Sequence, residues 1–353
     1  MNEQTIRIGF IGAGDICRVR HLPGLAALNN VEVVAVCNRS RSSAERIAAD
    51  FDIPEIVEDW KSLIHRPDLD AVFIGTWPYM HAEMSIACLQ AGKHCFCQAR
   101  MCMNLAEAKK MAETASACPE LVNMICPPPT RMPFEPYVQQ IITNNELGQI
   151  MMVQLDTVNG ANLTTDSIHW RERIEFSGQQ VMAMGIFAET LNAWVGPYQE
   201  LSAYTSTPIT EKTDESGNKI PIKIPQLVTI TGRLESGALA VEHHNGVAGD
   251  KSTPATCLRI WGTSGTLQYH FGDTIEFATS GNLLETVSVA PELQRPWLVE
   301  RDFVNAVRDA ERGELPETRP VSPDFNEGLL YMRKVEAVHR SAHTAQAIKP
   351  AQL

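Results

Sequence analysis

The segment that most restricts the fold is a glycine turn near the N-terminus. An apolar run at 6–11, IRIGFI, leads directly into GAGDIC at 12–17. A helical pattern follows over 19–28, and a second apolar run, VEVVAVC at 31–37, closes the unit. Strand, glycine turn, helix and strand within about 30 residues are typical of the βαβ unit that binds dinucleotides. The alternative is a tight βα turn beside an empty pocket.

The two glycines predict how such a cofactor would bind. Gly12 permits the tight turn, and Gly14 lets the backbone approach a pyrophosphate at the N-terminus of the helix. Asp15 and Ile16 lie between the turn and that helix, and we expect them beside the cofactor as well. Cys17 stands where a third glycine often lies, and we expect the helix and the strand to sit slightly further apart there.

The end of the second strand bears on the choice between NAD and NADP. An acidic residue at this place holds the adenosine ribose in many NAD-binding proteins. Here the sequence is NRSR at 38–41, without a carboxylate. A 2′-phosphate would therefore not be repelled, and a guanidinium can pair with it. We predict NADP rather than NAD, with Asn38 and Arg39 at the site; alternatively the arginines belong only to a solvated loop.

The alternation of strand and helix continues to about residue 125. The further apolar runs are 69–75, 94–97 and 121–125, and the helical stretches between them are 80–91 and 104–117. This α/β pattern predicts a Rossmann domain over 1–125 with a doubly wound parallel sheet. Ligands of such sheets bind beyond the carboxyl ends of the strands. Thr76, Trp77 and Gln98 lie at those ends, and we predict that they contact the cofactor.

The stretch GKHCFCQARMCM at 92–103 raises the question of a metal site. Cys95 and Cys97 would share one face of a strand. Structural zinc sites usually space their cysteines by two to four residues and use four ligands. Here the cysteines are spaced by one residue and then by four, and no second pair is obvious. We therefore predict the end of a buried strand, with no metal.

Residues 126–353 are predicted to form a second, α+β domain. The proline-rich segment 127–136 breaks the chain before it, and 207–226 is polar and rich in turn formers, which predicts a surface excursion. The helical stretches are 135–147, 297–311 and 323–345, and the strand-like runs are 150–158, 227–233, 237–244, 256–261 and 265–271. These runs predict an open, largely antiparallel mixed sheet. The last helices could return to the first domain.

Charge and composition restrict the partners and the location. The net charge is −12, and no stretch concentrates lysine and arginine. Nucleic acid and anionic membrane surfaces need clustered positive charge, so we expect neither as a partner. No apolar segment approaches the roughly 20 residues of a membrane helix. The N-terminus does not resemble a secretion signal, and the nine cysteines are expected to be reduced thiols in the cytoplasm.

Six motifs together resemble the Gfo/Idh/MocA family, named after glucose–fructose oxidoreductase and inositol dehydrogenase. They are GFIGAGDICRVRHLPGL, DAVFIGTWPYMHAEMSIACLQAGKHCFC, NNELGQI, HWRERIEFSGQQ, RIWGTSGTLQ and FNEGLLYMRKVEAVHRSA. The resemblance implies hydride exchange between a nicotinamide and a hydroxyl or carbonyl carbon of a sugar, cyclitol or similar small molecule. It also implies a homo-oligomer, a dimer or tetramer, formed through the C-terminal sheet. His81 matches a histidine common in the family, which we interpret as structural and count with the cofactor-binding positions.

The sequence departs from this family where proton transfer is expected. Members typically carry Glu-Lys-Pro after the fourth strand, and the lysine position here is Ala99. An aspartate and a histidine one helical turn apart correspond to Ala183 and Phe187. All three acid/base positions are therefore apolar. A positioned acid or base contributes about 10²–10⁴ in rate, so its loss matters.

Four residues are candidates to replace the missing groups. His169 and Arg171 lie in a loop that, by the resemblance, approaches the substrate. Of the neighbouring His243 and His244 on one strand, at most one can face a pocket, and we predict His244. Arg100 cannot act as a base but can hold a carboxylate or an oxyanion. The alternatives are a surface-loop histidine, a hydrogen-bonded histidine on a sheet face, and ordinary ion pairing of the arginines.

Three functions are compatible with these residues. The favoured one is an NAD(P)-dependent oxidoreductase with an atypical acid/base site, acting on a sugar-like or cyclic hydroxy compound with or without a carboxylate. The second is a non-redox lyase, decarboxylase or hydrolase on the same scaffold. The third is a catalytically silent sensor that binds a dinucleotide.

Overall fold

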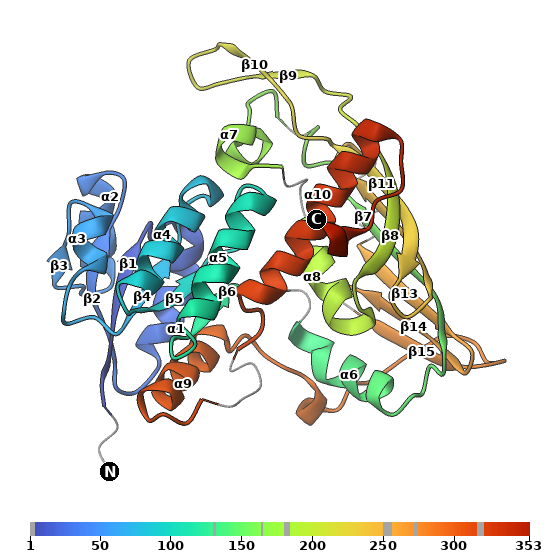
Figure 1. Ribbon diagram of the computed structural model, residues 1–353, viewed down its shortest axis with the longest axis horizontal. Coiled ribbons are helices and arrows are strands. Elements are labelled where there is room, and N and C mark those ends of the chain that lie inside the picture. Colours follow the sequence, from blue (N-terminus) through green and yellow to red (C-terminus); the bar gives the residue numbers. More distant parts are fainter. Residues whose placement is uncertain are drawn as a thin grey trace. The chain divides into compact units, whose positions relative to one another are not determined.

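The first sheet has six strands in the order β3-β2-β1-β4-β5-β6, and every pair in it is parallel (Figure 1). The strands are β1 Ile6–Ile11, β2 Val31–Cys37, β3 Glu55–Ile56, β4 Ala71–Ile74, β5 His94–Cys97 and β6 Asn123–Ile125. This is the strand order of a doubly wound dinucleotide-binding sheet. The fold class predicted for the first domain is confirmed.

The computed structural model describes residues 4–129, 132–163, 165–179, 184–249, 256–271, 274–315 and 321–353. The chain divides into two units. The first comprises Met1–Pro127 and Leu298–Leu329, and the second comprises Pro128–Trp297 and Leu330–Leu353. Residues 298–329 thus return to the first unit after the chain has built most of the second.

The helices of the first unit follow the predicted alternation. They are a π-helical turn at Cys17–His21, α1 Leu22–Ala26, α2 Arg41–Asp50, α3 Trp60–Ile64, α4 Pro78–Gln90, α5 Leu105–Ala117 and α9 Val299–Glu311. The helix predicted over 19–28 thus begins earlier, as a π turn, and ends at Ala26.

An aromatic ladder crosses the middle of the first sheet. Phe10, Phe73 and Phe96 lie at paired positions of three neighbouring strands, with ring centroids 5.1 Å and 4.3 Å apart. Phe303 of α9 meets Phe73 edge to face at 5.2 Å. Each such aromatic pair adds about 0.5–1.5 kcal/mol beyond the burial of its area. The ladder therefore explains why α9 belongs to this core.

The second unit is built on an eight-stranded sheet in the order β16-β15-β14-β13-β7-β12-β11-β8. Its strands are β7 Ile150–Val158, β8 Tyr198–Ser206, β11 Leu227–Leu234, β12 Leu239–Asn245, β13 Cys257–Gly262, β14 Gly265–His270, β15 Ile275–Thr279 and β16 Glu285–Thr286. All pairs are antiparallel except β7 with β12. The predicted mixed, largely antiparallel sheet is confirmed; which two strands form its parallel pair was not predicted.

Helices cover one face of this second sheet (Figure 1). The helical segments of the unit are Met132–Phe134, α6 Glu135–Thr143, Trp170–Glu172, α7 Ile174–Ser177, α8 Met184–Val195, Pro291–Leu293, Pro350–Gln352 and, from Leu330 on, α10 Phe325–Thr344. Within the predicted surface excursion, β9 Glu211–Thr213 and β10 Lys219–Pro221 pair as a small separate hairpin.

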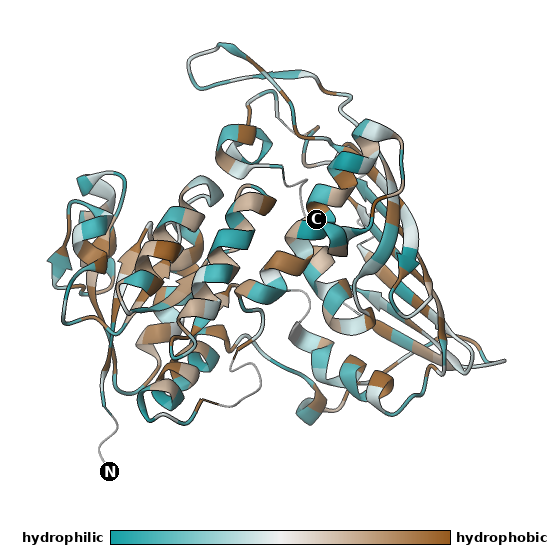
Figure 2. Ribbon diagram, viewed as in Figure 1, coloured by the Kyte–Doolittle hydropathy of each residue, from teal (hydrophilic) through white to brown (hydrophobic). Residues whose placement is uncertain are grey.

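The strands of the first sheet are largely hydrophobic, and most helices carry both hydrophobic and hydrophilic residues (Figure 2). This distribution follows the expected burial of one stripe of each helix. Among the helices that the structure describes, none is both long enough and apolar enough to cross a bilayer.

A buried ion pair fastens α10 to the second sheet. The ammonium nitrogen of Lys334 donates to both carboxylate oxygens of Glu242, at 2.6 Å and 2.8 Å. Tyr198 Oη donates to Glu242 Oε1 at 2.7 Å, and His244 Nε2 lies 3.1 Å from Oε2. Burial alone would raise the pKa of Glu242, but Lys334 and then His244 outweigh it and lower the pKa to about 2.

We predict that Glu242→Gln destabilises the protein at neutral pH. Removing one partner of a buried pair leaves an uncompensated charge and costs about 3–5 kcal/mol in the free energy of unfolding. The pKa falls from 4.5 to about 2 on folding, so this stabilisation is complete above pH 4.5 and is lost as the pH falls toward 2. Urea unfolding between pH 7 and pH 3 measures both effects.

The control for this prediction replaces both members of the pair. Glu242→Gln combined with Lys334→Met removes both charges, so it should recover most of the lost stability. A single Glu242→Gln variant that is as stable as the wild type at pH 7 would show that the pair does not contribute to the free energy of unfolding.

Candidate functional site

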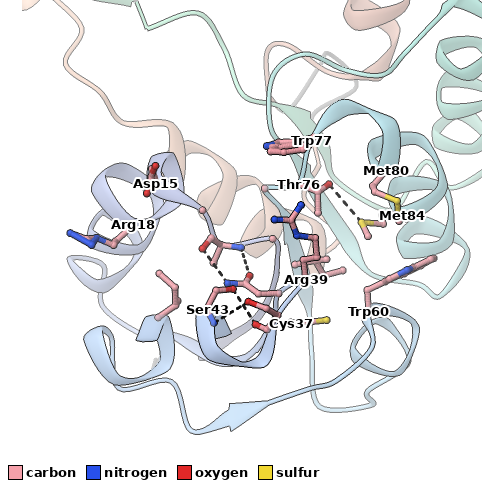
Figure 3. Close-up of a pocket in the computed structure, with 18 of the residues that line it drawn as sticks. Asp15, Arg18, Cys37, Arg39, Ser43, Trp60, Thr76, Trp77, Met80 and Met84 are labelled. Carbon is pink, nitrogen blue, oxygen red and sulfur yellow. Dashed lines mark hydrogen bonds between the residues drawn. The ribbon is translucent and has the colours of Figure 1, made fainter. Parts of the chain in front are cut away.

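A pocket of about 680 Å³ opens at the carboxyl ends of β1, β2 and β4, entirely within the first unit (Figure 3). This volume falls in the usual range for cofactor sites, about 300–1,000 Å³. Seven residues predicted to bind the cofactor line it: Gly12, Gly14, Asp15, Asn38, Arg39, Thr76 and Trp77. The predicted position of the dinucleotide at the strand ends thus coincides with a real cavity.

Gly12 and Gly14 are glycines for different reasons. Gly12 has φ of +75°, and a Cβ there would lie 2.5 Å from Thr76 Cγ2 and 2.7 Å from the Thr76 nitrogen. Gly14 has no such neighbour, since its Cβ would meet nothing closer than the Gly12 oxygen at 4.0 Å. The protein itself leaves the space at Gly14 open, as close approach of a ligand to the backbone requires.

Cys17, at the place of the usual third glycine, is accommodated by a glycine on the neighbouring strand. A Cβ at Gly75 would lie 2.4 Å from the Cys17 sulfur and 2.7 Å from the Gly12 oxygen. The glycine that allows close packing thus stands at position 75, just after β4, and not at position 17 in the helix. Burial raises the pKa of Cys17 to about 12, so the thiol stays neutral beside the turn.

The end of β2 carries an amide and a guanidinium. Asn38 Oδ1 accepts the Ala13 backbone N–H at 2.7 Å, which ties the glycine turn to the second strand. The Arg39 guanidinium lies over the Trp77 ring, 5.7 Å from its centroid, inside the pocket (Figure 3). Ser40 caps α2 by accepting the Ser43 N–H at 3.3 Å.

Acidic side chains also line this pocket, but two of them have partners. Asp59 caps α3 by accepting the Ser62 N–H at 2.9 Å. Glu58 accepts a hydrogen bond from Arg41 at 3.0 Å. These contacts reduce the negative potential that a cofactor phosphate would meet.

Three other predicted cofactor residues are not among those that line the pocket. Ile16 is 40% exposed. The buried His81 places its ring nitrogens 2.7 Å from the Arg100 oxygen and 2.9 Å from the Thr76 oxygen, which fits the structural interpretation. Gln98 donates from Nε2 to His21 Nε2 at 3.0 Å. Contact of these three with the cofactor stays a prediction.

The loop after β5 holds no lysine. Ala99 stands where the resemblance implies a lysine, and Arg100 beside it is only 4% exposed. The cysteine-rich stretch is the end of a buried strand, as predicted, and burial raises the pKa of the Cys97 thiol well above its usual value. Among the described residues, histidine, cysteine and acidic side chains form no cluster suited to a metal ion.

The resemblance implies an aspartate at position 183 and a histidine at position 187, on α8 and just before it. Ala183 lies outside the described residues. Phe187 is buried and meets Phe271 edge to face at 4.9 Å. Phe271 in turn packs against Tyr269 at 4.4 Å. Position 187 thus contributes to an aromatic cluster instead of presenting a titratable group.

His244 is buried with both ring nitrogens engaged. Thr157 Oγ1 lies 2.8 Å from Nδ1, and Glu242 Oε2 lies 3.1 Å from Nε2. This favours the alternative considered from the sequence, a hydrogen-bonded histidine on the inner face of the sheet. Its catalytic role stays a prediction.

His169 and Arg171 lie together at a short 3-10 turn of the second unit. His169 Nδ1 accepts the Arg171 backbone N–H at 3.2 Å, so the neutral ring carries its proton on Nε2. The Arg171 guanidinium lies over the Trp170 ring, 4.3 Å from the centroid. In this arrangement both side chains are hydrogen-bond donors, and neither is a ready base.

Several pocket residues were not predicted from the sequence. Arg18, Trp60, Met80 and Met84 all line the cavity (Figure 3). Arg18 follows Gly14 by four residues, about one helical turn, so its position relative to the glycine turn could have identified it. Trp60 lies on α3 and carries no local signal, because only the packing of α3 brings it to the cavity.

Comparison with known families agrees with this geometry. Residues 6–124 match the model described as an oxidoreductase family with an NAD-binding Rossmann fold. Residues 137–268 match the GFO/IDH/MocA C-terminal domain. The chain belongs to the Gfo/Idh/MocA family. The two matches cover most of both units, so the resemblance drawn from the motifs is confirmed.

Individual Gfo/Idh/MocA relatives resemble this chain at moderate identity. Levoglucosan dehydrogenase of Pseudarthrobacter phenanthrenivorans is 24% identical over 295 residues, 76% of this chain and 74% of the relative. 4-Carboxy-2-hydroxymuconate-6-semialdehyde dehydrogenase of Sphingobium sp. is 30% identical over 151 residues, 43% of this chain. A dTDP-sugar 3-reductase of Saccharopolyspora spinosa is 38% identical over 122 residues, 35% of this chain. The chain spans only 46% and 33% of the lengths of the last two.

Solved structures of the family share the complete fold. Levoglucosan dehydrogenase in complex with NADH and L-sorbose has a TM-score of 0.88 at 20% identity, covering 98% of this chain and 100% of that one. An oxidoreductase domain protein from Kribbella flavida has a TM-score of 0.84 at 19% identity, covering 98% and 99%.

We predict that Gly75→Ala weakens dinucleotide binding at least tenfold and lowers the melting temperature. The new methyl group would overlap the Cys17 sulfur and the Gly12 oxygen, so the glycine turn must shift. Fluorescence titration with NADH and NADPH, together with thermal unfolding, measures the two effects. Gly249→Ala is the control, because a Cβ there meets no atom within 4 Å. Equal behaviour of both variants would contradict the close contact at Gly75.

Proposed function

We propose that this protein is an NAD(P)-dependent oxidoreductase that exchanges a hydride with a hydroxyl or carbonyl carbon of a sugar-like or cyclic hydroxy compound. The observation that carries the proposal is the pocket built on the Gly12–Gly14 turn, in a chain of the Gfo/Idh/MocA family. The names of several relatives support it, including levoglucosan dehydrogenase and 1,5-anhydro-D-fructose reductase.

The residues present fit a nicotinamide dinucleotide. When bound, that cofactor supplies or accepts the hydride. Gly14 leaves the backbone approachable, and Arg18, which also lines the pocket, can pair with a pyrophosphate. Trp77 and the methionines of α4 provide apolar walls.

We further propose that NADP is preferred to NAD. The end of β2 carries no carboxylate to hold a ribose 2′-hydroxyl, and the Asn38 amide is already bonded to Ala13. Arg39 lines the pocket next to Ser40, so a guanidinium and a hydroxyl are available to a 2′-phosphate.

Arg39→Ala tests the cofactor preference. We expect the dissociation constant of NADPH to rise about tenfold, which is about 1.4 kcal/mol, while that of NADH changes about twofold or less. Fluorescence titration of both cofactors gives the numbers. Arg312→Ala is the matched control, since Arg312 pairs with Asp309 and Glu314, and none of these three residues lines the pocket. An equal loss for both cofactors in Arg39→Ala would rule out recognition of the 2′-phosphate.

The acid/base chemistry is proposed to be non-standard. Ala99 and Phe187 supply no proton carrier where the family usually has lysine and histidine. His169, Arg171 and Arg100 are the proposed substitutes, and they act as hydrogen-bond donors to an oxyanion. Donors of this kind stabilise the alkoxide that hydride addition to a carbonyl produces, and the alkoxide then takes its proton from water.

The same apolar positions favour a second candidate. This candidate binds the dinucleotide without redox turnover, either as a sensor or as a non-redox lyase, decarboxylase or hydrolase. Such a protein would need neither the lysine nor the histidine that the family usually has at positions 99 and 187. Binding of NADPH without any change in nicotinamide absorbance, over a broad panel of hydroxy and carbonyl compounds, would favour this candidate over the oxidoreductase.

Assembly and location are also proposals. The open face of the second sheet exposes Tyr204 and Leu239, 76% and 50% accessible, and we propose that it forms a homodimer or homotetramer. The nine cysteines are all free thiols, which fits the cytoplasm.

A further inference from the structure

Arg171 differs from Arg173 and Glu172, its charged neighbours in the loop, in having no internal counter-ion among the described residues. Arg173, two residues later, pairs with Glu175 at 2.6 Å and lies over the Phe176 ring. Arg171 lies over Trp170 instead, and the described part of the chain places no carboxylate oxygen within ion-pair distance of it. The same loop therefore contains two arginines, of which Arg173 forms an ion pair with a carboxylate and Arg171 does not.

The carboxylate next to Arg171 in sequence is already occupied. Glu172 Oε1 lies 2.9 Å from the ammonium of Lys212, whose side chain is only 2% exposed. Asn162 Nδ2 donates to the same oxygen at 3.3 Å. Glu172 Oε2 accepts the His169 backbone N–H at 2.9 Å. Because Glu172 pairs with Lys212, this neighbouring carboxylate does not serve as the counter-ion of Arg171.

The position of Arg171 suits recognition of a flat anion. Stacking on Trp170 uses the face of the guanidinium and leaves its N–H groups, which lie in the plane, to point outward. That fork matches the two oxygens of a carboxylate. The backbone is held at both ends, since the Arg171 N–H donates to His169 Nδ1 and its oxygen accepts Ser177 Oγ at 2.9 Å.

The environment of Arg171 combines access with partial desolvation. The residue is exposed to solvent, yet neighbouring protein atoms bury the guanidinium enough to lower its pKa. A cation that has lost part of its hydration and has no counter-ion gains more from binding an anion than a fully solvated one.

We infer that Arg171 binds a carboxylate group of the substrate. One guanidinium matches a monoanion, whereas a phosphate dianion would call for more than one positive charge. The inference rests on the proposed function and narrows its substrate class to hydroxy or carbonyl acids. Arg171 is then a specificity-determining residue.

The binding test uses the full-length protein and a small probe. Sodium acetate is titrated while the Arg171 Nε–Hε signal is followed by NMR, with the assignment taken from its loss in Arg171→Lys. We expect a saturable shift with acetate, and none with acetamide or with sodium chloride at equal ionic strength. Arg173→Gln should keep the response, because that arginine has its own carboxylate. A response equal for acetate and acetamide, or abolished in Arg173→Gln, would overturn the inference.

A kinetic test separates this inference from the proposed function. For a carboxylated substrate found in the panel, Arg171→Gln should raise KM at least tenfold and change kcat less, and Arg173→Gln should change neither. An acetate response in a protein that turns over no compound would refute the oxidoreductase and leave the anion site standing. Preferential turnover of neutral compounds, or dissociation of the oligomer in Arg171→Gln, would refute the carboxylate assignment instead.

Discussion

The close approach of the backbone at Gly12 to the backbone at Thr76 is the contact on which the cofactor half of this protein depends. Any side chain at position 12 would overlap Thr76, and any at position 75 would overlap Cys17 and Gly12. Because the ends of β1 and β4 meet this closely, the chain can turn sharply and leave a cavity beyond the strand ends. The missing third glycine is tolerated only because glycine appears at position 75.

The second unit depends on a different contact, the buried pair of Glu242 and Lys334. It joins α10 to the sheet and engages His244 and Tyr198 around one carboxylate. A histidine that the sequence offers as a proton carrier is thereby surrounded by fixed partners. Moving the proton of such a group would disturb the whole hydrogen-bond network, which favours the structural interpretation of His244 over the predicted catalytic one.

The nucleotide pocket and the proposed acid/base positions differ in character. The pocket has the glycine turn and Arg39, whereas positions 99 and 187, where the resemblance implies a lysine and a histidine, are apolar. What remains near the 3-10 turn of the second unit is a pair of donors, His169 and Arg171. Their geometry is suited to holding negative charge, and this links the loss of the acid/base residues to the proposed preference for a carboxylated substrate.

The sequence by itself determined the elements whose signal is local. The boundaries of β2, β5 and β7, the glycine turn and the family follow from periodicity and motif, because burial of one face repeats at the spacing of its own element. Only the tertiary structure decided the parallel pairing of β7 with β12, the return of α9 to Phe73, the fit of Cys17 against Gly75 and the engagement of His244. These contacts join residues far apart along the chain, and no local pattern records which distant surface completes a packed core.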